Sequence, residues 1–215
     1  MEAFSDGVIA ILITVMVLEL HVPQGTTWGA LHESLPTLLT YVLSFVYLGI
    51  YWNNHHHMLM LTERVGGLVL WANLHLLFWL SLVPFATGWM GENHFAKVPT
   101  SGYGIVLLGA AVAYFVLQTT IVRKQGADST LATAIGRDLK GKASPALYVA
   151  GIALAFVNRW FGIAMYVVVA LMWLIPDRRL ERMIAAAEDQ AINGGGHGQQ
   201  RGTADQVIGI SERSP

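Results

Sequence analysis

The sequence contains no cysteine, so disulfide bonds, thiolate metal sites and cysteine nucleophiles are excluded within these 215 residues. Charge is scarce as well: charged side chains make up 13% of the chain, against about 25% in an average soluble domain. The net charge of −1 lacks the basic excess typical of nucleic-acid-binding proteins, and we expect no nucleic-acid partner.

Apolar residues are abundant, at 54% of the chain with a mean hydropathy of +0.49. This composition predicts an all-α integral membrane protein, because a helix pairs its own backbone N–H and C=O groups inside the bilayer. The chain is long enough for six transmembrane helices of about 20 residues each. The stretches that we expect to span the membrane are 7–22, 36–53, 67–89, 103–122, 143–158 and 160–176.

Basic residues are distributed unevenly around these stretches. If the N-terminus is cytoplasmic, eleven of the 13 Lys and Arg residues fall on the cytoplasmic side, and only Lys97 and Arg159 fall outside. Positive charge favours the cytoplasmic side, so both termini are predicted to be cytoplasmic. We expect a transmembrane domain over residues 1–185 and a polar tail over residues 186–215, with an amphipathic helix over residues 177–192.

Polar residues open the first predicted span, in the run Phe4-Ser5-Asp6-Gly7. From spacing alone, the favoured interpretation is that Ser5 or Asp6 caps the helix. Asp6 also suits the positive end of the helix dipole.

Further along the same span, Ile11, Val15 and Leu18 are spaced i, i+4 and i+7 and share one helical stripe, with Thr14 beside it. Periodicity alone favours an ordinary apolar stripe of a membrane helix. The alternative requires several copies of the helix around an axis, so that the stripe forms stacked rings that close a pore by dewetting. Glu19 is then either an interfacial carboxylate or part of a ring that concentrates cations at the outer mouth.

Three adjacent histidines, His55 to His57, follow Trp52 at the end of the second span. Consecutive helical residues point about 100° apart, and the nearby sequence offers only Glu63 as an acidic partner, so no metal site is expected. One of these histidines is free to pack against the polar end of the first span. In the third span, Asn73 and His75 are expected to form interhelical hydrogen bonds, with a proton-sensing role left open for His75.

Two further motifs bear on the fold. Pro84 is expected to kink the outer end of the third helix. The run Thr100-Ser-Gly-Tyr-Gly104 is similar to the selectivity filter of ordinary potassium channels, but residues 91–99 are too short and polar for the pore helix that such a filter needs. We therefore expect Thr100 or Ser101 to be the N-cap of the fourth helix.

The run Phe4-Ser5-Asp6-Gly7-Val8, with Ala10, Ile11 and Thr14, resembles the prokaryotic branch of the transmembrane protein 175 family. The resemblance covers about residues 3–185. The family motif begins with an arginine four residues before the phenylalanine, a position that would precede Met1 here. The later matching positions, in order, are Tyr41, Ser44-Phe45, Trp52, His55, Asn73, Pro84-Phe85, Thr87 and Pro176–Arg179.

The resemblance implies a homotetrameric potassium channel of six-span subunits, with the first helix lining the pore. The positions that match the family's hydrophobic constriction are Ile11, Val15 and Leu18, and Thr14 matches the threonine that contributes to potassium selectivity. The expected function is passive, leak-like potassium conduction across the bacterial plasma membrane, without enzyme activity or cofactor. A supporting polar network is expected from Trp52, His55, Asn73 and His75.

Two alternative functions remain open from the residues themselves. One is a secondary transporter with its site near Asn73, which saturable, ion-coupled flux would support. The other is a membrane metalloprotein or haem protein that uses the histidines, which bound metal or visible absorbance would support.

Overall fold

The computed structural model describes residues 1–62, 65–126, 129, 131–132 and 139–174. All regular structure in this part of the chain is helical. The predicted amphipathic helix, the polar tail and the C-terminal limit of the membrane domain lie outside the described residues. The helices are α1 (Glu2–Leu18), α2 (Trp28–Met60), α3 (Gly67–Ser81), α4 (Val83–Glu92), α5 (Lys97–Gln125), α7 (Leu139–Val157) and α8 (Arg159–Leu174).

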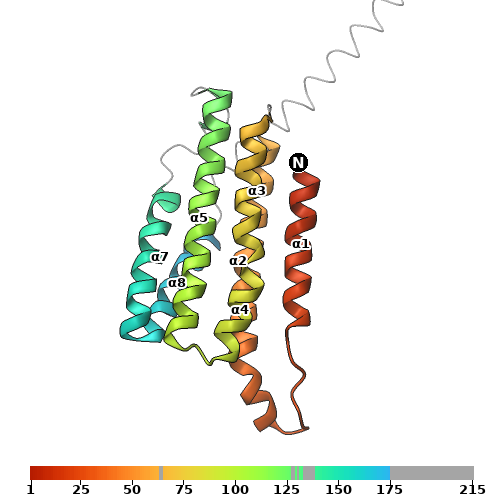
Figure 1. Ribbon diagram of the computed structural model, residues 1–215, viewed down its shortest axis with the longest axis vertical. Coiled ribbons are helices and arrows are strands. Elements are labelled where there is room, and N and C mark those ends of the chain that lie inside the picture. The colour runs from red at the N-terminus through yellow and green to blue at the C-terminus, as the bar shows by residue number, and fades with distance from the viewer. Residues whose placement is uncertain (63–64, 127–128, 130, 133–138, 175–215) are drawn as a thin grey trace, which may run out of the picture. The chain divides into compact units, whose positions relative to one another are not determined.

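The helices run up and down the bundle (Figure 1). Helices α1, α2, the α3–α4 pair and α5 run alternately in opposite directions. One end of the bundle therefore holds the start of α1, the end of α2, the start of α3 and the end of α5. Each apolar stretch predicted from the sequence overlaps one of these helices or the α3–α4 pair, although residues 19–22 lie beyond the end of α1 and residues 175–176 lie outside the described residues. Among the described residues, three segments are long and apolar enough to cross a bilayer: Trp28–Met60, Gly67–Glu92 and Lys97–Gln125. The chain is therefore a multi-pass membrane protein whose described part is all-helical.

The helix ends differ from the sequence predictions in two places. Helix α1 already begins at Glu2, and the Ser5 hydroxyl donates to the carbonyl oxygen of Met1, so neither Ser5 nor Asp6 caps it. Helix α5 begins at Lys97, so Thr100 and Ser101 lie inside its first turns. Both cap predictions are wrong, because the helices extend past the apolar stretches into polar sequence.

The third predicted span is interrupted as expected near Pro84. Helix α3 ends at Ser81, and α4 begins at Val83 with proline in its first turn. Proline has no N–H to donate to the preceding turn, which explains a break at this point. The interruption turns the C-terminal part of the span into a separate short helix.

Buried tyrosines join α2, α5, α7 and α8. Tyr47 donates from its hydroxyl to the carbonyl oxygen of Tyr166 at 2.6 Å, and the Tyr166 hydroxyl donates to the carbonyl oxygen of Thr100 at 3.2 Å. Tyr103 lies 3.0 Å from the Ser44 hydroxyl, and the Tyr148 ring packs against the rings of Tyr47 and Tyr166. A phenol buried in an apolar bundle needs such partners, since an unpaired hydroxyl is costly to desolvate. These tyrosine contacts pack α2, α5, α7 and α8 together on one side of the bundle. On the other side, α1 packs against α2, α3 and α4.

Candidate functional site

Helix α1 has two distinct faces. Its buried face carries Ser5, Ile9, Leu12 and Met16, spaced i, i+4, i+7 and i+11. The opposite face carries the predicted stripe, where Ile11 is 61% exposed, Val15 37% and Leu18 83%. The stripe therefore points away from the rest of its own subunit.

Other motif residues share the exposed side of α1. Phe4 is 59% exposed, and Gly7 and Thr14 are exposed too. The Thr14 hydroxyl donates to the carbonyl oxygen of Ile11 at 2.8 Å, within the same helix. A hydroxyl oxygen has two acceptor lone pairs besides its donor hydrogen, so the Thr14 oxygen remains able to accept a hydrogen bond or contact a cation on the exposed face.

A buried polar network fixes the start of α1 to α2 and α3. Asn73 Nδ2 donates to Ser5 Oγ at 2.9 Å, and Asn73 Oδ1 accepts from His55 Nε2 at 2.7 Å. The amide oxygen can only accept, so Nε2 of His55 carries the hydrogen. Ser5 and His55 are fully buried and Asn73 is almost so. Buried polar side chains are normally hydrogen-bonded, because an unpaired one destabilises the fold. Here each of the three side chains belongs to a different helix, so their hydrogen bonds join α1, α2 and α3.

The four residues expected to form one network are divided between three places. His55 and Asn73 come together, with Ser5 as the third member. Trp52 instead stacks on His56, with ring centroids 5.9 Å apart, and His75 accepts a hydrogen bond from Trp79 Nε1 at 3.0 Å within α3. The sequence pattern predicted Ser5 as a helix cap, and spacing along the chain gave no signal that it shares the buried face of α1 with Ile9.

Replacing Asn73 with leucine should lower the free energy of unfolding by about 1–3 kcal/mol, because two interhelical hydrogen bonds are lost and the His55 N–H is left buried without an acceptor. The measurement is thermal unfolding in detergent, with Asn54→Leu as the matched control. In the part of the chain that the structure describes, the Asn54 amide donates to Ile50 of its own helix, and the bond from Tyr114 goes to the Asn54 backbone, which leucine keeps. Equal destabilisation by the two variants would contradict a role of the network in joining the helices.

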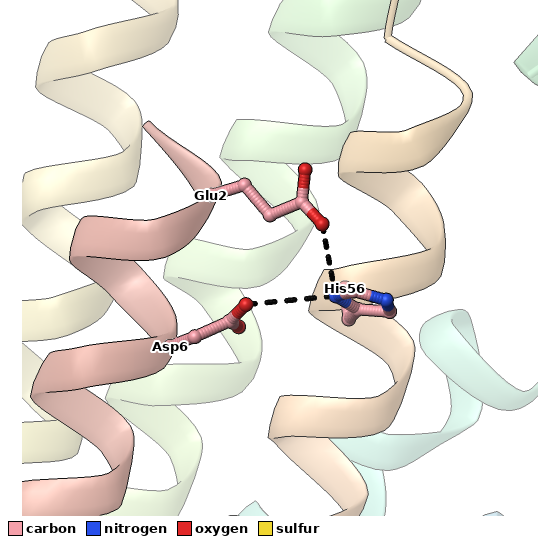
Figure 2. A group of neighbouring side chains, drawn as sticks. All are labelled: Glu2, Asp6 and His56. Atoms are coloured by element: carbon pink, nitrogen blue, oxygen red, sulfur yellow. Dashed lines mark ion pairs between the residues drawn. The ribbon is translucent and has the colours of Figure 1, made fainter.

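A second polar cluster lies at the same end of α1 (Figure 2). Glu2 and Asp6, one turn apart on α1, face His56 of α2, whose Nδ1 lies 3.1 Å from Glu2 Oε1 and 3.6 Å from Asp6 Oδ2. The three side chains are 29–44% exposed. The sequence near the histidines offers only Glu63 as an acid, whereas these two carboxylates come from α1, about 50 residues earlier in the chain.

Glu19 occupies the opposite end of α1, as its C-cap, and its side chain is exposed. Partial burial raises the pKa of this carboxyl, and the negative charge of Glu92, the last residue of α4, raises it further. A raised pKa means that Glu19 loses its charge at a higher pH than an ordinary glutamate does.

Among the known families and proteins that are similar to this chain, the three examples that follow are all named as potassium channels. The family model "Endosomal/lysosomal potassium channel TMEM175" matches residues 1–84. A potassium channel of Chryseobacterium sp. (strain P1-3) is 52% identical over 184 residues, which cover 86% of this chain and 96% of the relative. A potassium channel of Chamaesiphon minutus is 32% identical over 188 residues, which cover 81% of this chain and 92% of the relative.

A solved structure is similar as well. The crystal structure of a lysosomal potassium-selective channel TMEM175 homolog from Chamaesiphon minutus has a TM-score of 0.70 to this chain, at 31% sequence identity. The match covers 81% of this chain and 94% of that one.

Proposed function

The chain belongs to the TMEM175 family, and from this premise we propose that it is a subunit of a potassium channel whose pore is lined by α1. The observation that carries the proposal is the exposed apolar stripe of Ile11, Val15 and Leu18. This stripe lies on the helix that begins with the family's Phe-Ser-Asp motif, and the polar network anchors the opposite face of that helix to α2 and α3.

A homotetramer is the assembly that we propose for this stripe. Four copies of α1 around an axis would arrange Ile11, Val15 and Leu18 as three stacked rings. Apolar rings of this kind close a narrow pore by excluding water, which makes passage of a hydrated ion costly. The Thr14 oxygens would lie between these rings and lower that cost for a partly dehydrated potassium ion. Conduction would be passive and leak-like, with no enzymatic step and no cofactor.

The membrane arrangement follows from the positions of charge. Six spans are proposed, formed by α1, α2, the α3–α4 pair, α5, α7 and α8, with both termini in the cytoplasm and the protein in the bacterial plasma membrane. Arg123 and Lys124 end α5, and Lys140 and Lys142 begin α7, whereas Lys97 and Arg159 begin α5 and α8 at the opposite end. The positive-inside rule places the first group in the cytoplasm. Residues 1–185 would form the channel domain and residues 186–215 a polar tail.

Glu19 would then lie at the outer mouth of the pore. Four carboxylates close to the axis would raise the local concentration of potassium. Because the pKa of Glu19 is raised, this attraction would be lost on acidification at a higher pH than for an ordinary glutamate.

The test is current through planar bilayers that contain the purified protein, with potassium on one side and sodium on the other. We expect discrete openings and a reversal potential close to the potassium equilibrium potential. Absence of current from folded protein, or a reversal potential near zero, would contradict a potassium channel.

The transporter alternative is less well supported by the polar groups. The proposed site residue is Asn73, whose amide oxygen accepts a hydrogen bond from His55 and whose amide nitrogen donates one to Ser5. Both ends of the side chain therefore already bind other residues of the protein. Saturable flux that depends on a coupled ion, without single-channel openings, would favour the transporter.

A further inference from the structure

The cluster of Glu2, Asp6 and His56 has no part in the proposed conduction mechanism. Its two carboxylates belong to successive turns of α1, and its imidazole belongs to α2 (Figure 2). One ligand atom from each side chain can be chosen so that all three lie within 4.8 Å of one another. The cluster therefore combines a nitrogen donor with two oxygen donors across the contact between two helices.

The spacing of these atoms suits a metal ion. Bonds of about 2.0–2.1 Å in a tetrahedral zinc site place neighbouring ligand atoms about 3.4 Å apart. His56 Nδ1 lies 3.1 Å from Glu2 Oε1 and 3.6 Å from Asp6 Oδ2, on either side of that value. With all three donor atoms within 4.8 Å of one another, rotation of the side chains would direct them at one ion.

One atom of the cluster, Asp6 Oδ1, is shielded from solvent and lacks a hydrogen bond within the described part of the chain. His56 Nδ1 is shielded as well, and its neighbours are the two carboxylates. A buried carboxylate oxygen without a donor is costly, and a bound cation would remove that cost. The His56 ring is also held in place by stacking on Trp52, with 25° between the ring planes. The imidazole is thus oriented before any ligand arrives.

We propose that Glu2, Asp6 and His56 form a binding site for a divalent transition-metal cation of the zinc type, which joins α1 to α2. The two carboxylates balance the charge of the ion, and neutral imidazole supplies the nitrogen ligand. Because the side chains are 29–44% exposed, water completes the coordination sphere. Magnesium and calcium prefer sites made only of oxygen, so the site discriminates against them.

The site has a consequence for conduction, and this part rests on the proposed function. Opening a constriction lined by α1 requires that helix to move relative to α2. A bound cation links two successive turns of α1 to α2 and therefore holds the helix arrangement of this structure, in which the proposed apolar rings would close the pore. Micromolar zinc on the cytoplasmic side should reduce the potassium current, whereas millimolar magnesium should not.

Binding is tested on the purified protein in detergent, by calorimetric titration with Zn²⁺ in the presence of excess Mg²⁺. We expect one ion per chain, with affinity at least ten-fold weaker in both His56→Gln and Asp6→Asn. His57→Gln is the matched control, since it removes a neighbouring histidine outside the cluster, and its affinity should stay within about three-fold of the original. Affinity that depends equally on His56 and His57 would assign the metal to the histidine run and overturn the proposal.

Cobalt provides a readout that needs no variant. Co²⁺ bound to the unchanged protein should give visible absorption typical of nitrogen and oxygen ligands, and Zn²⁺ should abolish it by displacement. No absorption and no titration heat would overturn the metal site, whether or not the protein conducts. Metal binding without a potassium current would instead retain the site and contradict the proposed function.

Discussion

Replacing Ile11 with asparagine should raise the single-channel conductance about five-fold and weaken the preference for potassium over sodium. Ile11 is 61% exposed on the face of α1 that we assign to the pore, so its side chain would form one of the apolar rings. An amide at this position would hold water in the constriction and reduce the barrier to a hydrated ion. A barrier lower by about 1 kcal/mol corresponds to this increase in rate.

Val17→Asn is the matched control for Ile11→Asn. Val17 is also exposed, at 46%, and lies on the same helix, but it is spaced i+6 from Ile11 and lies outside the stripe. Single-channel recording of both variants in symmetric potassium should show the increase for Ile11 alone. Similar conductance in Ile11→Asn and the unchanged protein would remove Ile11 from the constriction.

Replacing Thr14 with alanine should abolish potassium selectivity, with the potassium-to-sodium permeability ratio falling to about one. The Thr14 hydroxyl already donates to the carbonyl oxygen of Ile11, so what the exposed face loses is an oxygen acceptor, while the helix keeps its backbone hydrogen bonds. Without that oxygen, the apolar rings contain no group that favours one partly dehydrated cation over another. The measurement is the reversal potential under a potassium-to-sodium gradient.

Thr14→Ser separates the role of the hydroxyl from that of the methyl group. Serine keeps the oxygen and its i−3 hydrogen bond, so selectivity should persist in this variant. Unchanged selectivity in Thr14→Ala, with discrete openings still present, would show that the Thr14 oxygen is not the selective group. The groups that select potassium would then have to lie on α2 or α3.

The helices could be predicted from the sequence because helix formation in a membrane depends on short-range properties. Long charge-free stretches indicated every helix that the structure describes, and Pro84 indicated the break between α3 and α4. The predicted helix ends were less accurate than the predicted helix positions. Helix α2 begins at Trp28 and α5 at Lys97, and both starts precede the apolar stretches that predicted these helices. Helix propagation continues through polar residues that carry no hydropathy signal.

The stripe on α1 could be found from periodicity, but its exposure could not. Spacing alone allows Ile11, Val15 and Leu18 to face the core, lipid or a pore. Only the packing of Ile9, Leu12 and Met16 against the rest of the subunit leaves the other face of α1 free. The pore role of the stripe stays a prediction that the Ile11 and Thr14 variants test.

The sequence by itself therefore determined the class of protein, the position of its helices and its family, since hydropathy, helical period and the Phe4-Ser5-Asp6 motif can all be read along the chain. The tertiary structure alone decided which polar groups meet. Asn73 binds a serine 68 residues away, and His56 of α2 faces Glu2 and Asp6 of α1. These contacts depend on which helix faces come together, and the rotation of each helix is set by packing over its whole length, which local sequence does not encode.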